Sequence, residues 1–98
     1  SLERLVRLTA EQPARHYGLY PRKGTILVGA DADLTLVDLD RQAEVRGAEL
    51  ESKTKQTPFE AMILRGWPTL TVVSGKVVMR DGQVVSDPPC GSFVHPGF

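Results

Sequence analysis

The sequence has one cysteine, Cys90, so the chain cannot form an internal disulfide. A single thiol is typical of a reducing compartment, and we expect a cytoplasmic location. Basic and acidic residues number twelve each, so no excess charge attracts nucleic acid or an anionic membrane. No apolar run approaches the roughly 20 residues of a membrane-spanning helix, and SLERLVRL lacks the apolar centre of a signal peptide.

Aromatic residues are also few: one tryptophan, two tyrosines and three phenylalanines. Binders of single-stranded nucleic acid need several aromatic rings along a basic groove. Lys53, Lys55, Arg65 and Trp67 form at most a small basic and aromatic group. We therefore expect no nucleic-acid partner, and interpret Trp67 as a core or seam residue at the start of a strand.

Patterns typical of metal sites are incomplete. Four aspartates lie close together in the stretch DADLTLVDLD: Asp31, Asp33, Asp38 and Asp40. The stretch begins like a calcium loop, but Leu36 stands where that loop requires glycine. We expect these aspartates to flank and edge a strand. His16, His95 and Cys90 are too scattered for a closed zinc site. We interpret His16 as a packed side chain beside Tyr17, and His95 as a solvated one.

Nucleophiles and phosphate loops are not indicated either. Ser74-Gly75 has the form of a hairpin turn rather than a strand-to-helix elbow, and Cys90 has no neighbouring base. GLYPRKGT, residues 18–25, matches no glycine spacing that cradles phosphate. Arg22, Lys23 and Gly24 are therefore interpreted as a structural turn, with an anion site as the alternative. The residues nominate no catalytic, metal-binding or substrate-binding side chain.

Helical spacing dominates the first twenty residues. LERLVRL, residues 2–8, places apolar residues on one side of a short helix. Thr9 and Gln12 form a capping-box pattern, which predicts that a second helix begins at Thr9 with Pro13 in its first turn. Gly18 is placed to end that helix.

The period then changes from helical to two, which predicts strands. We expect strands at 33–39 and 43–47, a polar loop over 48–58, a short apolar run at 61–66 and strong β structure over 67–85. Ser74-Gly75 and Asp81-Gly82 are typical of two-residue hairpin turns. The remaining residues are rich in proline and glycine and are expected to be irregular.

Four motifs in order carry a family resemblance: TAEQPARHYGLYPRKGTI, VGADADLTLVD, SKTKQTPFE and RGWPTLTVVSGKVVMRDGQVV. Over residues 2–96 the chain resembles the C-terminal end of a cyclic amidohydrolase, in the branch with dihydroorotase, dihydropyrimidinase (hydantoinase) and allantoinase. SKTKQTPFE leans toward dihydroorotase and allantoinase, and GWPTLTVVSGKVVMRDG toward hydantoinase. The substrate stays open.

The resemblance implies a mainly β fragment with N-terminal helices (α+β), part of the small β-sandwich beside a (β/α)₈ hydrolase barrel. Residues 1–20 would be helices leaving the barrel, 21–86 sandwich strands, and 87–98 an irregular C-terminal arm like one that often packs on a neighbouring subunit. The partners implied are the missing barrel, the N-terminal sandwich strands and further copies in a homo-oligomer.

The resemblance also implies a mechanism in which two divalent metals, commonly zinc, activate a bridging hydroxide that attacks a cyclic amide. The expected ligands all lie in the barrel. No cofactor is therefore expected in these 98 residues, and the chain alone should be inactive although its parent is an enzyme. The alternatives are a stand-alone β-rich binding or oligomerisation module, and an unrelated nucleic-acid or small-ligand binder.

Three residues depart from the family pattern. Gln12 stands where asparagine is common, and His16 where an aliphatic side chain is usual. Ala61 follows TPFE where the family would place glycine. If that position has a positive φ, alanine there is strained by about 1 kcal/mol or more.

Overall fold

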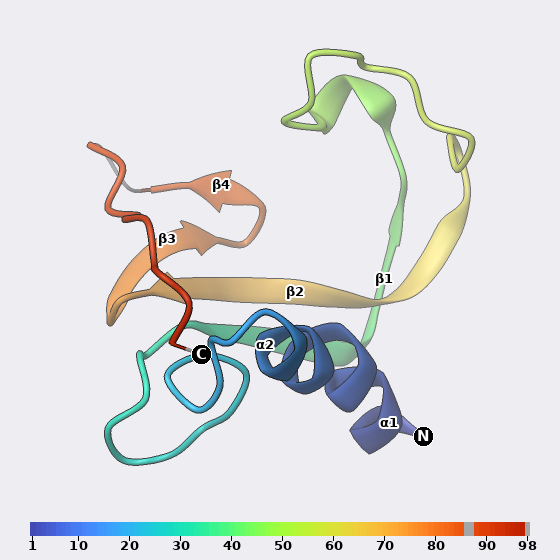
Figure 1. Cartoon of the computed structure of the whole chain (residues 1–98). Helices are drawn as coiled ribbons and strands as arrows, with labels where there is room; N and C mark the ends of the chain where they lie inside the picture. The colour runs from blue at the N-terminus through green and yellow to red at the C-terminus, as the bar shows by residue number, and fades with distance from the viewer. Residues whose placement is uncertain (86–87, 98) are drawn as a thin grey trace.

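The structure is a computed structural model that describes residues 1–85 and 88–97. A helix at the start precedes a four-stranded antiparallel sheet in the order β1-β2-β3-β4 (Figure 1). The helical elements are α1 (Leu2–Val6), η1 (Arg7–Glu11), α2 (Gln12–His16) and η2 (Gly47–Glu49). The strands are β1 (Leu34–Glu44), β2 (Ile63–Val73), β3 (Lys76–Arg80) and β4 (Gln83–Val84). The predicted class, mainly β with N-terminal helices, is confirmed.

The first three helical elements form one continuous helix over residues 2–16, so the predicted start of a second helix at Thr9 was wrong. Thr9 lies inside the helix, where its hydroxyl donates to the Leu5 carbonyl at 2.8 Å. The middle element η1 is π-helical, and the Gln12 N–H donates to Arg7 O five residues back. Pro13 explains the wider turn, because its ring would crowd the carbonyl four residues earlier in a regular helix.

Gly18 ends the helix as predicted, with a φ of 72° that glycine adopts at little cost. The carbonyl of Ala14 then accepts two N–H groups, from Leu19 at 2.8 Å and from Tyr20 at 3.1 Å. These bonds turn the chain into the connector, residues 17–33, which leads to the sheet.

The strands β1 and β2 are longer than the sequence predicted. Residues 34–44 form one strand, which joins the expected strand at 33–39 to the start of the one expected at 43–47. Residues 45–47 are not part of it, and Gly47 begins η2. The apolar run expected at 61–66 joins the following strand, as β2 begins at Ile63.

The register between β1 and β2 has two irregularities. One lies beside Pro68, which cannot donate to the ladder. At the other, the Asp38 carboxylate accepts the N–H groups of Asp40 and Arg41.

The two predicted hairpin turns are confirmed. Ser74 and Gly75 both have positive φ, 51° and 79°, between paired residues of β2 and β3. Asp81 and Gly82, at 48° and 82°, connect β3 to β4 in the same way. Positive φ at both central positions is the turn geometry that matches the twist of an antiparallel pair.

The far end of the β1–β2 hairpin carries a loop, residues 45–62, that projects from the rest of the molecule (Figure 1). The Val45 N–H donates to Met62 O at 2.8 Å, and the Ala61 N–H to Val45 O at 2.9 Å, which closes the loop at its base. Ala61 has a φ of 66°, so the predicted strained alanine lies in the left-handed region.

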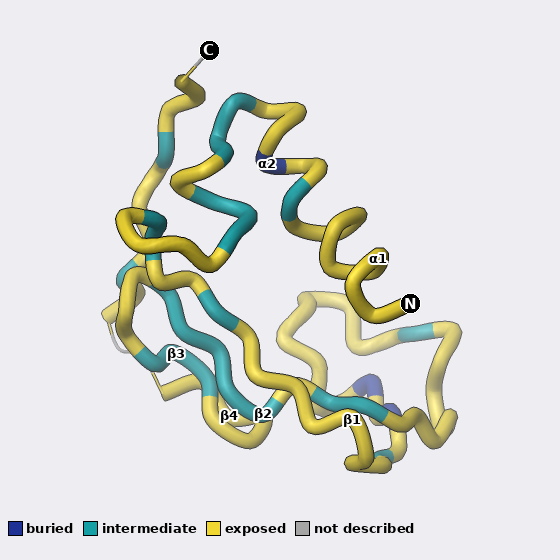
Figure 2. The backbone as a smooth tube through the Cα atoms, turned by 90° about the horizontal axis from the view of Figure 1, so that it is seen from below, coloured by how far each residue is buried: buried dark blue, intermediate teal, exposed yellow. Residues whose placement is uncertain are grey.

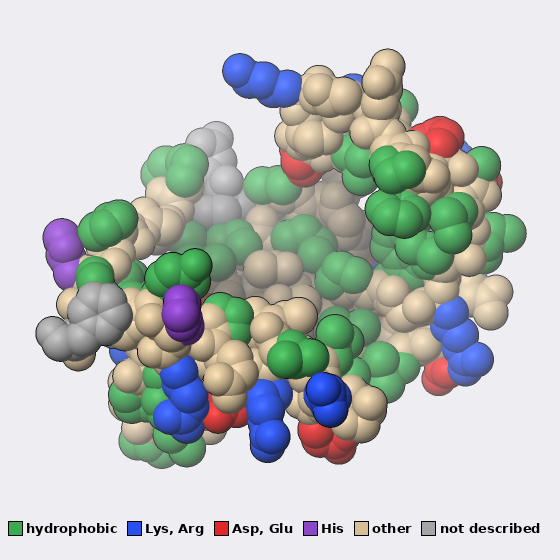
Figure 3. All heavy atoms as spheres, turned by 45° about the vertical axis from the view of Figure 1, so that its right-hand side comes forward, with side chains coloured by type: hydrophobic (Ala, Val, Ile, Leu, Met, Phe, Trp, Pro, Cys, Tyr) green, Lys and Arg blue, Asp and Glu red, His purple; other side chains and the backbone are tan. Residues whose placement is uncertain are grey.

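Very little of the chain is buried. Among the described residues, Ala14 and Val45 are the hydrophobic residues in the buried class, 5% and 8% exposed (Figure 2). Many large apolar side chains are open instead, including Leu5, Leu39 and Phe59. Hydrophobic side chains are also exposed on the face shown in Figure 3. A chain with this surface has an unfinished core.

Residues 88–97 contain no helix or strand. The boundary between residues 86 and 87, proposed from the sequence, lies outside the described residues.

Candidate functional site

A groove of about 990 Å³ separates the helix from β1. Its apolar lining comes from both sides: Leu2, Leu5 and Val6 on the helix, Ile26 on the connector, and Leu34, Val37 and Leu39 on β1. Leu5, Val6 and Leu39 are each more than half exposed. The two apolar walls therefore face each other across an open groove instead of packing together. This arrangement suits an apolar protein segment better than a small polar substrate.

An ion cluster lies at the rim of the groove, on the connector. The Lys23 ammonium lies 2.9 Å from the Asp31 carboxylate and also binds Asp33. The hydrogen bond from Lys23 is the main cause that lowers the pKa of Asp31, and Arg22 at 2.9 Å lowers it further. Bonds to Asp31 and then to Asp33 raise the pKa of Lys23 in turn.

Asp33 ties this cluster to the sheet. Its Oδ1 accepts the Ser74 N–H at 2.8 Å, in the turn between β2 and β3. The pKa of Asp33 is lowered first by Lys23 and then by this backbone N–H. Arg22 and Lys23 are thus occupied by carboxylates, which supports the structural-turn interpretation over an anion site.

Arg15 forms an ion pair in the last turn of the helix. Its partner is Glu11 on the same helix, at 3.0 Å. The Arg15 guanidinium also lies over the Tyr20 ring, 3.7 Å from its centroid. The helix end is therefore linked to the connector by a cation–π contact.

His16, His95 and Cys90 each contact a different neighbour. The His16 ring packs edge-on against Tyr17, with centroids 5.0 Å apart, and His95 packs similarly against Phe93 at 4.8 Å. Cys90 is a half-buried free thiol. Within residues 1–85 and 88–97, no group of three or more His, Cys, Asp or Glu side chains could hold a metal ion. No helix in these ranges is both long and apolar enough to span a membrane.

The remaining candidate residues lie in or beside β1 and β2. Asp31 and Asp33 precede β1, as predicted, whereas Asp38 and Asp40 lie within it because the strand continues to Glu44. Asp40 accepts a hydrogen bond from the Arg65 guanidinium of β2 at 2.6 Å. Trp67 is half-buried and lies within β2 rather than at a strand start, so its predicted position was wrong. Its indole N–H donates to Leu64 O at 2.7 Å.

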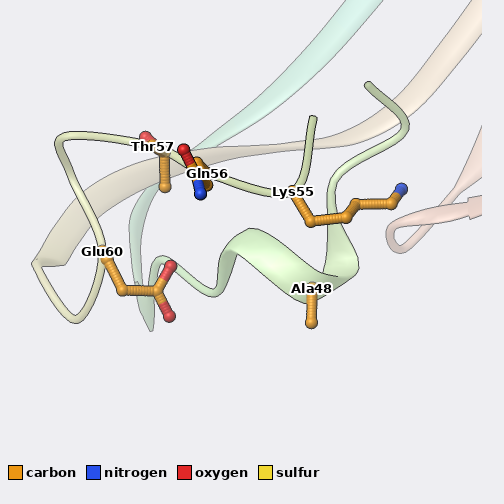
Figure 4. Close-up of a pocket in the computed structure, with 5 residues that line it drawn as sticks. All are labelled: Ala48, Lys55, Gln56, Thr57 and Glu60. Carbon is orange, nitrogen blue, oxygen red and sulfur yellow. The ribbon is translucent and has the colours of Figure 1, made fainter. Parts of the chain in front are cut away.

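A second hollow, of about 380 Å³, lies in the projecting loop and is lined by Ala48, Lys55, Gln56, Thr57 and Glu60 (Figure 4). Glu60 Oε2 accepts the Gly47 N–H at 2.6 Å, and the Thr57 hydroxyl accepts the Phe59 N–H at 3.1 Å. Lys55 extends away from Glu60 and donates to Leu50 O (Figure 4). These polar groups hold the loop together.

Sequence reasoning missed the pairing of Gly47 with Glu60. A Cβ atom on Gly47 would lie 2.2 Å from the Lys55 carbonyl oxygen, so only glycine fits. The two residues are thirteen positions apart, and no local spacing signals such a contact.

Comparisons with known proteins match this chain over most of its length. The model of the "Amidohydrolase family" matches residues 1–78. The chain is 46% identical to an L-hydantoinase of Paenarthrobacter aurescens over 94 residues, which is 96% of this chain and 20% of that protein. It is 46% identical to a dihydroorotase of Methanothermobacter thermautotrophicus over 85 residues, 87% of this chain and 20% of that one.

Solved structures give the same result. A D-hydantoinase structure superimposes with a TM-score of 0.90 at 33% identity, over 96% of this chain and 21% of its own. The L-hydantoinase of Arthrobacter aurescens superimposes with a TM-score of 0.85 at 46% identity, over 88% of this chain and 19% of its own. The 98 residues thus span about a fifth of the length of these relatives. With a helix and four-stranded sheet that match a fragment of hydantoinase structures, the chain belongs to the amidohydrolase family.

Proposed function

We propose that this chain is the C-terminal, small-domain part of a metal-dependent hydrolase that cleaves the C–N bond of a cyclic amide. Relatives named as hydantoinases and dihydroorotases support the substrate class. The observation that carries the proposal is the unfilled apolar groove between the helix and β1, in a chain that spans a fifth of its relatives. The rest of the parent protein, its barrel and N-terminal sandwich strands, would cover that groove.

On this proposal the residues of this chain have a structural role and take no part in the chemical reaction. Two divalent metals, commonly zinc, would be held by the parent barrel and would supply the activated hydroxide for amide hydrolysis. The described residues offer no matching ligand set, so we assign them no catalytic step. Their part is to seat the last helix and to complete the small β domain beside the barrel.

The first experiment measures the mass of the protein in its native source, detected through a peptide of this chain. We expect a mass several-fold above 10.7 kDa, since a hydrolase barrel needs roughly 250 residues. The protein at the length found in its source (the native-length protein) is then assayed with zinc on hydantoin, dihydroorotate, a dihydropyrimidine and allantoin. Hydrolysis by the native-length protein but not by the 98-residue chain supports the proposal. Activity of the 98-residue chain alone contradicts it.

A pair of variants tests the groove separately from catalysis. Val6 lines the groove, whereas the neighbouring Arg7 does not. If the parent covers the groove, Val6→Asp places an unpaired charge in an interior and should cost about 3 kcal/mol of the unfolding free energy of the native-length protein. Arg7→Asp is the matched control and should change it by about 0.5 kcal/mol or less. Equal, small effects of both variants would mean that the groove stays open to water.

The alternative is a stand-alone binding or oligomerisation module. It is favoured by one observation: the outer edge of β1 is unpaired in the four-stranded sheet. Open strand edges promote self-association, so this module should form concentration-dependent oligomers in sedimentation. A native mass equal to that of the 98 residues, together with such oligomers, would select the alternative over the hydrolase fragment.

A further inference from the structure

The helix is not packed directly onto the sheet. In the described part of the chain, no Cα atom of the helix lies within 8 Å of a Cα atom of any strand. The groove separates them instead. The hydrogen bonds that connect the helix end to the sheet run through the segments that link the two.

The connector, residues 17–33, is the first link. At the helix it packs closely, because a Cβ atom on Gly24 would lie 2.6 Å from the Cβ of Ala14. At the sheet it is bound through Asp33, which accepts the Ser74 N–H, and through Ala32, whose carbonyl accepts the Gly75 N–H at 3.0 Å. This link joins the helix to the turn between β2 and β3.

Residues 88–97 form a second link between the same two places. The Gly97 N–H donates to the Gly18 carbonyl at 2.7 Å, at the turn that ends the helix. Near the other end of the segment, the Cys90 thiol lies 3.8 Å from Val73 O, the last residue of β2. Cys90 and Val94 are half-buried, whereas Phe93 between them is 80% exposed. Figure 1 shows this segment returning to the helix end and connector.

We propose that residues 88–97 act as a clasp that fixes the helix end to the sheet and so sets the width of the groove. With both links in place, the end of the helix is held to the sheet at two points. With the connector alone, the helix could rotate relative to the sheet. Because the contacts lie within this chain, the clasp does not depend on what fills the groove or on the hydrolase assignment. Release of the clasp would loosen the helix end and leave the strand pairing of the sheet intact.

The test replaces Gly97 in the native-length protein. If the native mass shows no larger parent, that protein is the 98-residue chain itself. Gly97→Pro removes the N–H that the clasp donates. Gly97→Ala keeps this N–H and is the matched control, since the nearest atom to its Cβ would be Gly18 O at an ordinary 3.8 Å. Hydrogen exchange is followed by mass spectrometry at the amides of Leu19 and Tyr20, which close the helix end.

Loss of the clasp bond should speed exchange of these two amides about two- to tenfold in Gly97→Pro, with wild-type rates in Gly97→Ala. Exchange in β2 should be unchanged in both variants. Unchanged rates in Gly97→Pro, or equal increases in both variants, would overturn the proposal.

A measurement on the unaltered protein guards against a variant that misfolds. The Gly97 amide should exchange at least about fivefold more slowly than in an isolated peptide of residues 88–97. If the Gly97 amide exchanges at the rate of the isolated peptide, the clasp is open in solution and the proposal is rejected.

Discussion

Replacing Ala61 with glycine is expected to stabilise the protein. Ala61 has a φ of 66°, and an L-residue in the left-handed region costs about 1–2 kcal/mol. The Ala61 side chain is exposed, so removing its methyl group forfeits little burial. Glycine adds about 0.4–1 kcal/mol of unfolded-state entropy, which offsets part of the relief. The net gain is between about 0 and 1.6 kcal/mol, near the middle of that range.

The assay is the free energy of unfolding from urea titration, supported by hydrogen exchange at the Val45 amide, which closes the base of the loop beside Ala61. Ala48→Gly is the matched control. It makes the same chemical change in the same loop, at an exposed residue of η2 whose φ is not positive. Ala48→Gly should therefore destabilise by about 0.4–1 kcal/mol.

Opposite signs for the two variants support the strain argument. If Ala61→Gly destabilises as much as Ala48→Gly, the left-handed conformation at Ala61 carries no cost and the reasoning fails. A further variant, Ala61→Val, should be worse than alanine, because a β-branched residue tolerates positive φ least.

Three other changes follow from the contacts described above. Lys23 holds the pKa of Asp33 below its ordinary 3.8. The stability that this ion pair adds is therefore complete above pH 3.8 and is lost as the pH falls through the lowered pKa. Asp33→Asn should weaken this loss of stability at low pH, measured as the unfolding free energy at a series of pH values. Gly47→Ala should lower the melting temperature by the equivalent of about 1–3 kcal/mol, because the new methyl group overlaps a backbone carbonyl. Arg15→Ala should cost about 0.5–1 kcal/mol in thermal melts, through loss of the Tyr20 contact, whereas an unchanged melting temperature would remove that role.

Features that depend on neighbouring residues were predictable from the sequence. The turns at Ser74-Gly75 and Asp81-Gly82, and the helix end at Gly18, require specific backbone angles that their residues reveal. The strain at Ala61 was predictable because the motif order identified the family pattern. The helix start at Thr9 failed since the capping pattern cannot show that the preceding turn continues as a π-helix.

Features set by distant contacts were not predictable. The sequence predicted breaks within β1 and β2 that the structure does not have. Pairing between the two strands resumes after each irregularity in the register, so both strands continue. The Gly47–Glu60 bond depends on the closed loop itself.

The unfinished core connects these observations to function. Ordering a residue costs about 1.5 kcal/mol, which apolar burial normally offsets. With Ala14 and Val45 as the buried hydrophobic residues of the described chain, little such burial is available within it. The backbone bonds and ion pairs seen here specify geometry, but exposed pairs of this kind add little stability. The exposed apolar walls of the groove are therefore a reserve of stabilising surface for whatever covers them. If a parent protein covers the groove as proposed, the order of these residues should depend on the rest of that protein.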